Sequence, residues 1–331
     1  MFMRVCTLLL LMLLPSPVSA ASVLVINSYH PEFAWVEEYS RGIASVLGYQ
    51  YTINHHYLDT KRLPQDQFNA QVDRAWAQYQ SLQPDIVVLA DDNAVELLSP
   101  RFSQLSVPVV VLGVNANPRT YGIHLMKNVT GVLERPLFNR SILLAAILVP
   151  HGDSTRFLVL FDNSPTSTAI VTHIKHSLQS HSIRNIHIDF QQTSAFDAWQ
   201  QIILEADGQG DEPGYEAIMI GLYHNIRDNK NQHIPPETAL QWAQAHAPVP
   251  HFGFWGFSIG KGRNIGGYVL DGFEHGKLAD TQIIQIVNGA EPQSVPFRSD
   301  IEGRYIFSKA GMQRWQLTLP EAIARQAEWV D

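Results

Sequence analysis

The chain has 331 residues and a formal net charge of −8, with 23 lysines and arginines against 31 aspartates and glutamates. Hydrophobic residues make up 45% of the sequence and aromatic residues 10%, so a packed core is expected and a disordered chain is excluded. The acidic balance argues against a nucleic-acid partner. The length suggests about two domains.

Residues 1–20 have the pattern of a secretory signal peptide. A short segment with one positive charge, Arg4, precedes the apolar run at residues 5–14, and residues 18–20 are small enough for cleavage. An apolar run of about ten residues is too short for a bilayer-spanning helix, which needs about 20. We therefore predict cleavage after Ala20, export to the periplasm and no stable membrane insertion. The single cysteine, Cys6, excludes a disulfide framework and a cysteine-based zinc site.

Strand-like apolar runs alternate with helix-like patterns along the rest of the chain. Expected strands lie at residues 23–27, 51–58, 85–90, 107–112, 156–161, 183–190, 216–222, 248–254, 264–270 and near 305. Expected helices lie at residues 32–47, 64–82, from about 94, 136–150, 166–178, 196–206, 235–246, 273–287 and around 312 and 321. Continuously apolar strands are typical of parallel sheets buried on both faces. The order predicts an α/β protein with two doubly wound, Rossmann-like lobes and a ligand cleft between them.

No catalytic motif is present in the sequence. There is no Gly-x-Ser-x-Gly elbow and no His-Glu-x-x-His zinc motif, and the glycines at 260–267 lack the spacing of a dinucleotide fingerprint. His55 and His56 would point to opposite faces of a strand. His173 and His176 share one helix face, where such a pair is usually only solvated. We predict no enzyme activity, no cofactor and no metal site.

Polar clusters follow six of the expected strands. In an open α/β sheet, ligands bind beyond the carboxyl ends of the strands, where helix N-termini gather. Each cluster alone is more typical of a helix cap or a turn, but together they predict a cleft that offers donors, acceptors and carboxylates. Aromatic residues near them, Phe254 included, are candidates for apolar walls, although Trp35 and Trp255 fit a core position equally well. The candidate ligand-binding residues are Ser28, Tyr29, His30, Trp35, Asp91, Asp92, Asn93, Asn115, Asp162, Ser164, Thr166, Tyr223, Trp255 and Asp271.

Short segments throughout the chain resemble the periplasmic ABC-transporter substrate-binding family, which has a type I periplasmic binding-protein fold. These segments are residues 23–30, Trp35, 41–43, 84–88, 108–115, 129–134, 266–269, 276–279 and 288–292. The same modules also serve as extracytoplasmic sensing domains or partners of membrane kinases and nucleotide cyclases. The segments at 28–30 and 113–115 are as similar to that branch as to the transporters.

The resemblance implies two lobes joined by crossover strands that close on a small ligand. We expect lobe 1 at 21–118 plus 257–292 and lobe 2 at 119–256 plus 293–331. The implied function is capture of a small ligand, such as an amino acid or a similar polar or aromatic molecule, for an ABC importer. The alternatives are a ligand-sensing partner of a membrane histidine kinase or nucleotide cyclase, and an exported hydrolase. The expected partner is therefore an inner-membrane permease or a sensor protein.

For an amino acid, the chemistry of the ligand assigns roles to the candidate residues. Its ammonium group needs a carboxylate, from Asp271, Asp91 or Asp92. Its carboxylate needs hydroxyl or helix-terminal N–H donors. The candidate hydroxyls are those of Ser28, Ser164 and Thr166. Tyr29, Trp35 and Trp255 would stack on an apolar or aromatic side group.

Overall fold

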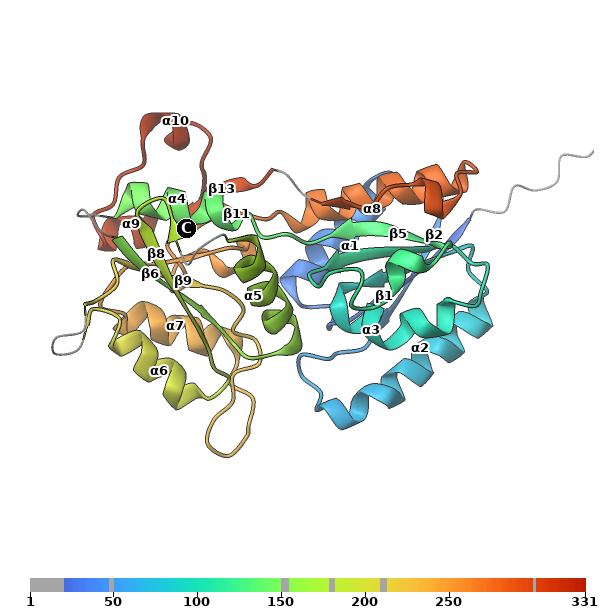
Figure 1. The fold of residues 1–331 in the computed structure, drawn as a ribbon, viewed down its shortest axis with the longest axis horizontal. Helices are drawn as coiled ribbons and strands as arrows, with labels where there is room; N and C mark the ends of the chain where they lie inside the picture. Colours follow the sequence, from blue (N-terminus) through green and yellow to red (C-terminus); the bar gives the residue numbers. More distant parts are fainter. Residues whose placement is uncertain (1–20, 48–50, 150–154, 179–181, 209–212, 300–301) are drawn as a thin grey trace, which may run out of the picture.

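The computed structural model describes residues 21–47, 51–149, 155–178, 182–208, 213–299 and 302–331, and the predicted signal peptide lies outside these ranges. Two α/β lobes lie side by side along the long axis of the molecule (Figure 1). Helix α5 stands at the junction between them. Among the described residues, no helix combines the length and the apolar character that a bilayer crossing requires.

The first lobe is built on a six-stranded parallel sheet with the order β12-β5-β4-β3-β1-β2. Its strands are β1 (Ser22–Asn27), β2 (Thr52–Tyr57), β3 (Ile86–Ala90), β4 (Val109–Val114), β5 (Val129–Leu133) and β12 (Arg298–Ser299). Helices α1 (Ala34–Leu47) and α8 (Gly272–Val287) cover one face, and α2 (Phe68–Leu82) and α3 (Asp91–Phe102) cover the other. Side chains of β1 alternate between these faces: Val25 packs with the α1 and α8 residues, and Ile26 packs with the α2 and α3 residues.

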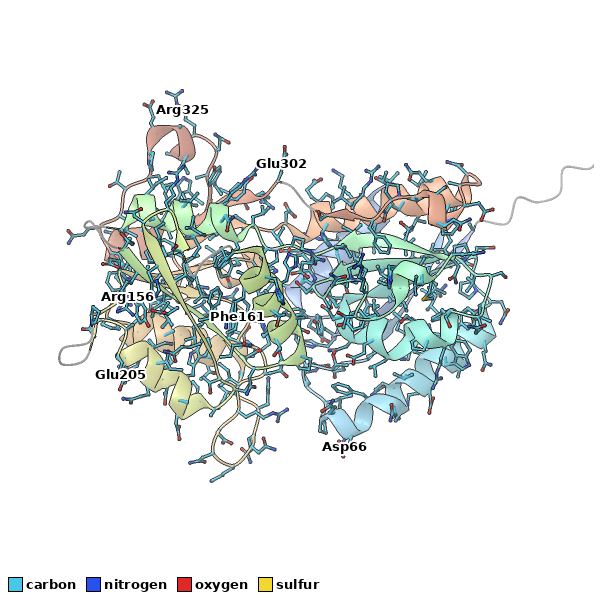
Figure 2. The ribbon with its side chains drawn as sticks, viewed as in Figure 1. Asp66, Arg156, Phe161, Glu205, Glu302 and Arg325 are labelled. Atoms are coloured by element: carbon cyan, nitrogen blue, oxygen red, sulfur yellow. The ribbon has the colours of Figure 1, made fainter. Side chains whose placement is uncertain are left out.

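The second lobe contains a five-stranded sheet with the order β10-β9-β6-β8-β7, parallel except for β7. Its strands are β6 (Thr155–Phe161), β7 (Ser182–Ile183), β8 (Ile186–Gln192), β9 (Ala217–Ile220) and β10 (His251–Gly253). Its helices are α4 (Phe138–Leu148), α5 (Pro165–Ser177), α6 (Phe196–Leu204) and α7 (Pro236–His246). Figure 2 shows Phe161, at the end of β6, inside this lobe, whereas Glu205 and Arg325 extend from its surface.

A three-stranded sheet and several short helices complete the described part of the fold. The sheet has the order β11-β13-β14, with β11 (Gly266–Val269), β13 (Arg304–Ser308) and β14 (Glu328–Val330). The short helices are α9 (Lys309–Arg314), α10 (Glu321–Ala324), and the 3-10 helices η1 (Gln65–Gln67), η2 (Ile123–Leu125), η3 (Gly256–Ser258) and η4 (Pro292–Ser294).

The predicted fold class is confirmed, because both lobes have parallel sheets with helices on their faces. The strand pairings differ from the expected lobe boundaries. β5 belongs to the first sheet because it pairs with β4. β12 also joins the first sheet, next to β5, whereas β11 pairs with β13 away from it. On these pairings we propose that the chain crosses between the lobes at 134–137, at 270–271 and after β12.

Helices α1 and α8 pack closely because each contributes a glycine that faces the backbone of the other helix. A Cβ added at Gly276 would lie 2.2 Å from the Tyr39 carbonyl oxygen, and one added at Gly42 would lie 2.2 Å from that of Phe273. These obstacles are backbone atoms, so a methyl group can be accommodated only if the helices move apart. Helices α1 and α8 together cover one face of the first sheet. Their contact therefore holds α8, from the C-terminal part of the chain, against the N-terminal helix α1.

Replacing Gly276 with alanine is therefore expected to lower the free energy of unfolding by about 1–3 kcal/mol, the usual range for overpacking. Urea denaturation measures this change. Gly256→Ala is a suitable control, because a Cβ there meets only the side-chain ends of Ile306 and Val269, at 3.3 Å and beyond. Equal stability of the two variants would contradict the assigned packing.

Candidate ligand-binding site

The carboxyl ends of both sheets open onto a small pocket between the lobes, the inner pocket. Several of its residues lie just beyond the end of a strand: Tyr29 lies two residues after β1, Asp91 directly follows β3 and Glu134 directly follows β5. The inner pocket is lined by Tyr29, Phe33, Trp35, Lys61, Asp91, Asn115, Glu134, Thr166, Leu222, Trp255 and Phe257. Its volume of about 10 Å³ has room for about one water molecule. The inner pocket by itself is therefore too small for a solute larger than water.

Two buried tryptophans hold the two carboxylates of the inner pocket. Trp35 Nε1 donates to Asp91 Oδ1 at 3.1 Å, and Trp255 Nε1 donates to Glu134 Oε1 at 2.7 Å. The two indoles are 3% and 1% exposed, so each serves as a wall of the pocket and as a core residue. The two predicted positions, pocket wall and core, are therefore compatible for these side chains.

Asp91 has an unusual backbone and an unfilled hydrogen-bonding capacity. Its φ of +68° lies in the left-handed region, which non-glycine residues rarely adopt and which is enriched at functional sites. Its Oδ2 is buried and has no hydrogen-bond partner among the described residues. Burial raises the pKa of the Asp91 carboxyl well above its ordinary value, and the nearby charges of Glu134 and Asp92 raise it further. A cationic hydrogen-bond donor beside Asp91 would offset both the burial of its carboxylate and the repulsion by these charges.

Glu134 is the second buried carboxyl of the inner pocket. Besides the Trp255 bond, it accepts a hydrogen bond from Asn115 Nδ2 to Oε2 at 3.1 Å. Burial raises the pKa of Glu134 to about 7, although these two donors oppose the shift. Near neutral pH the group therefore exists in both protonation states.

Lys61 reaches the inner pocket from the loop after β2 and is only 4% exposed. Its ammonium lies 4.2 Å from the centre of the Tyr29 ring and 4.9 Å from that of Phe33, within the range of cation–π attraction. Burial lowers the pKa of Lys61, whereas the charges of nearby carboxylates, first that of Asp162 and then that of Asp91, act in the opposite direction.

Two larger cavities flank the inner pocket, and Lys61 lines all three. The first, the histidine cavity, has a volume of about 290 Å³. It is lined by His30, Glu32, Phe33, Ala34, Lys61, Arg62, Tyr223, His224, His233, Pro236, Glu237, Leu240, Phe257 and Arg263. The second, the asparagine cavity, has a volume of about 330 Å³. It is lined by Tyr29, Thr60, Lys61, Leu63, Pro64, Gln65, Phe68, Asn93, Ser164, Pro165, Thr166, Asn225, Arg227 and Asn231.

Ten of the fourteen predicted site residues line one of these interlobe cavities. Those at the inner pocket are Tyr29, Trp35, Asp91, Asn115, Thr166 and Trp255. His30 and Tyr223 line the histidine cavity, and Asn93 and Ser164 line the asparagine cavity. The two lobes also touch here, because Tyr29 Oη and Thr166 Oγ1 lie 3.3 Å apart. The structure thus brings these predicted residues together.

The other four predicted residues, Ser28, Asp92, Asp162 and Asp271, line none of these three cavities. Each one instead satisfies nearby backbone groups. Ser28 Oγ accepts from the Ala94 amide at the start of α3, and Asp271 accepts from the Phe273 amide at the start of α8. Asp92 accepts from the amides of residues 115 and 116, and Asp162 from that of residue 225.

Ser164 shares this capping behaviour although it borders the asparagine cavity. Its Oγ donates to Asp162 Oδ1 at 2.6 Å and accepts from the Ser167 amide at 3.3 Å. Ser28 Oγ donates to the Ala90 carbonyl at 2.7 Å, and Thr166 Oγ1 lies 3.3 Å from Tyr29 Oη, so all three hydroxyls expected to bind a ligand carboxylate already have a partner within the protein.

Sequence reasoning did not select five residues that prove central to the cavities. These are Phe33, Lys61, Glu134, His224 and Phe257. Lys61 and Glu134 do carry a signal, because each follows a strand of the first sheet within four residues of its end. His224 lies in a polar cluster that the sequence marks after β9. Phe33 and Phe257 carry no such signal.

Metal ligation has no visible basis in the described ranges: no group of three or more histidine, cysteine, aspartate or glutamate side chains is placed to share an ion. His55 stacks on Tyr57, with ring centres 5.9 Å apart. His56 Nδ1 lies 2.8 Å from Gln78 Oε1. Both side chains are thus engaged by neighbours of the first sheet.

Comparison with solved structures finds the same architecture over nearly the whole chain. The ABC domain in complex with L-Trp from Streptococcus pneumonia is 18% identical and aligns with a TM-score of 0.67, covering 95% of this chain and 100% of that one. The ligand-free, open structure of a substrate binding protein with adhesive properties from Clostridium difficile is 12% identical and aligns with a TM-score of 0.67. This alignment covers 95% of this chain and 99% of that one. The 5-methylthioribose transporter solute binding protein from Thermotoga lettingae is 12% identical and aligns with a TM-score of 0.54, covering 87% of this chain and 86% of that one.

No protein-family model and no curated protein matches the sequence. The likeness is therefore one of architecture, and it agrees with the two parallel sheets whose carboxyl ends meet at the inner pocket. The chain has the type I periplasmic binding protein-like fold of ABC-transporter solute-binding proteins.

Proposed function

We propose that this protein is an extracytoplasmic solute-binding protein that captures a small ligand, such as an amino acid or a similar small polar or aromatic molecule, between its lobes and delivers it to an ABC importer. The observation that carries this proposal is the unpartnered Oδ2 of Asp91, which lies in a pocket walled by Trp35 and Trp255. Solved structures that share the fold include an ABC domain in complex with L-Trp and a solute binding protein in complex with 5-methylthioribose.

The inner pocket offers the surroundings that an ammonium group requires. Asp91 supplies a free carboxylate oxygen, and Glu134 supplies a second buried carboxyl. Aromatic faces surround them, and such faces attract cations and pack against apolar groups. Because the inner pocket itself holds about one water, the rest of a ligand has to lie in a flanking cavity. The histidine cavity, at about 290 Å³, is close to the lower limit of about 300 Å³ for ligand pockets.

Replacing Asp91 with asparagine is expected to weaken the binding of an amine-bearing ligand by about 10- to 100-fold, because a charge-assisted hydrogen bond is lost. Asparagine tolerates the left-handed backbone of this position, so the fold is expected to persist. The measurement is a thermal-shift screen of the purified protein against amino acids, purines, sugars and small carboxylates, with calorimetry on each hit. Asp73→Asn is the control, since Asp73 is exposed and forms only a surface ion pair with Arg101.

Equal affinity of the Asp91→Asn variant and the wild type would remove Asp91 from the site. Turnover of ester, phosphate or glycoside substrates, abolished by a single histidine or aspartate change, would overturn the binding function. Delivery to an importer has its own test: uptake of the labelled ligand should fall in cells that lack the protein and return with the wild-type chain. Unchanged uptake despite tight binding would contradict delivery and favour a sensory partner.

A further inference from the structure

We propose that the histidine cavity is the subsite for an anionic group of the ligand, a carboxylate or a phosphate, and that Lys61 and His224 contact this group. The assignment rests on the proposed solute-binding function and replaces the serine hydroxyls as receptors of the ligand's negative charge. Lys61 would then determine specificity, since it separates the cavity from the buried carboxylates of the inner pocket.

The environment of Lys61 leaves its hydrogen-bonding capacity open. An ammonium has three N–H donors, and in the part of the chain that the structure describes none of them forms a hydrogen bond or an ion pair with a carboxylate. Its near neighbours are the faces of Tyr29 and Phe33. A buried cation is stabilised fully only when it is both paired and hydrogen-bonded. An anion in the adjoining cavity would supply both interactions.

His224 provides an independent indication of the same chemistry. It is 5% exposed, lines the histidine cavity, and its buried Nδ1 has no hydrogen-bond partner among the described residues. Burial lowers the pKa of His224, and the positive charges of Lys61, His30 and His233 lower it further. The ammonium of Lys61 and two further imidazoles thus lie near one ring, and a bound anion would offset the charge of Lys61.

The remaining charges of the histidine cavity are consistent with this role. Arg263 lines it while donating to the Phe257 carbonyl at 2.8 Å. Arg62 is already paired with Asp59, and more distantly with Glu32 at 3.6 Å. The cavity's other carboxylate, Glu237, is exposed to solvent. The buried charge facing the cavity is thus the ammonium of Lys61.

Apolar walls define the second property of the ligand. His224 lies between aromatic rings, with ring centres 4.9 Å from Phe33, 5.5 Å from Phe257 and 4.5 Å from Tyr223. An anion attached to a flat or apolar body would match both the cations and these rings. Inorganic phosphate tests the charge alone, and 3-phenylpropionate tests the charge together with the apolar body.

The experiment compares three probes on the wild type and on Lys61→Gln by calorimetry: inorganic phosphate, 3-phenylpropionate and phenethylamine. Phenethylamine has a similar apolar body but the opposite charge. For the wild type we expect saturable binding of 3-phenylpropionate, tighter than that of phosphate. Lys61→Gln should weaken the binding of both anions at least about tenfold and leave the affinity for phenethylamine unchanged or higher.

Lys175→Gln is the matched control, because Lys175 also lies over an aromatic ring, 5.1 Å from the centre of Phe190, but is exposed on α5. This variant should bind all three probes like the wild type. His224→Phe provides a second test that retains a ring in the aromatic cluster, and it should also weaken the binding of both anions.

Failure of the anion subsite can be separated from failure of the proposed function. Binding of phenethylamine without binding of either anion would retain a solute-binding cleft and overturn the subsite. Anion binding that is unchanged in Lys61→Gln would also overturn it, since the anion would then lie elsewhere. An equal loss of all three probes in Lys61→Gln would assign Lys61 a structural role instead. If none of the probes binds the wild type, the subsite is rejected and the broader solute screen decides the function.

Discussion

The ionisation of Glu134 is expected to lower the free energy of unfolding by about 3 kcal/mol between pH 5 and pH 8. Replacing Glu134 with glutamine is expected to remove this pH-dependent loss of stability. The pKa of Glu134 is about 7 in the folded chain against an ordinary value of 4.5. Between these two values the folded state binds more protons than the unfolded state, so the contribution of Glu134 to stability falls as the pH rises. Below about 4.5 both states are protonated and above about 7 both are ionised, so the contribution is constant in either limit.

The quantity to measure is the free energy of unfolding of the wild type minus that of the Glu134→Gln variant, from urea denaturation at several pH values. A difference is needed because other buried groups titrate in the same range. Burial raises the pKa of Asp280 to about 6, which gives a slope of the same sign, and lowers the pKa of His251 to about 4, which gives the opposite sign. These contributions cancel in the difference.

Glutamine also loses one favourable contact, because its amide nitrogen cannot accept the hydrogen bond from Asn115. This loss is the same at every pH and does not alter the slope. Glu321→Gln, at an exposed position of α10, is the control for the same replacement at the surface. A flat difference for Glu134→Gln would show that Glu134 is ionised normally and is not part of a buried acidic pocket.

The protonation of Glu134 also bears on the proposed ligand. A neutral carboxyl cannot pair with an ammonium group, so a cation entering the inner pocket has to displace protons from Glu134 or Asp91. Because the pKa values of both groups are raised, the inner pocket avoids holding two buried negative charges that repel each other. Among the described residues that line the inner pocket, the one lysine is Lys61.

The sequence predicted most of the fold because its signals are local. Continuous apolar runs identified β3 and β4, and the alternation of strands with helices predicted two doubly wound lobes. The lobe crossings were less accessible, since they depend on long-range pairings. β12 has two residues and joins the first sheet only through β5, and nothing in the local pattern of residues 298–299 indicates that partner.

The candidate site was harder to predict than the fold because one side-chain chemistry serves two purposes. Asp91 and Asp271 both follow a strand and precede a helix. Asp271 accepts from the amides at the start of α8 and pairs with Arg304 at 2.7 Å, whereas Asp91 has a φ of +68° and lines the inner pocket. A backbone angle of this kind depends on the surroundings of the residue and has no sequence signature.

Replacement of Trp255 with alanine is expected to lower the free energy of unfolding by about 3–5 kcal/mol, the usual range for removing a buried aromatic side chain. The indole is 1% exposed and packs between Phe161 and Phe257, with ring centres 6.3 Å and 6.2 Å away. The alanine variant would also open the inner pocket, so we expect it to lose specific ligand binding. Urea denaturation and calorimetry with the ligand identified in the screen measure the two effects.

Trp255→Phe separates packing from hydrogen bonding at this position. Phenylalanine retains a ring but removes the Nε1 donor that lies 2.7 Å from Glu134 Oε1, at an expected loss of about 1–3 kcal/mol. Because that donor favours the ionised carboxyl, the variant should be destabilised more at pH 8 than at pH 5. Trp242→Phe is the control, since Trp242 is half-buried on α7 and stacks on His246. An equal loss at both pH values would mean that Trp255 acts by packing alone and that its bond to Glu134 does not set the charge of the pocket.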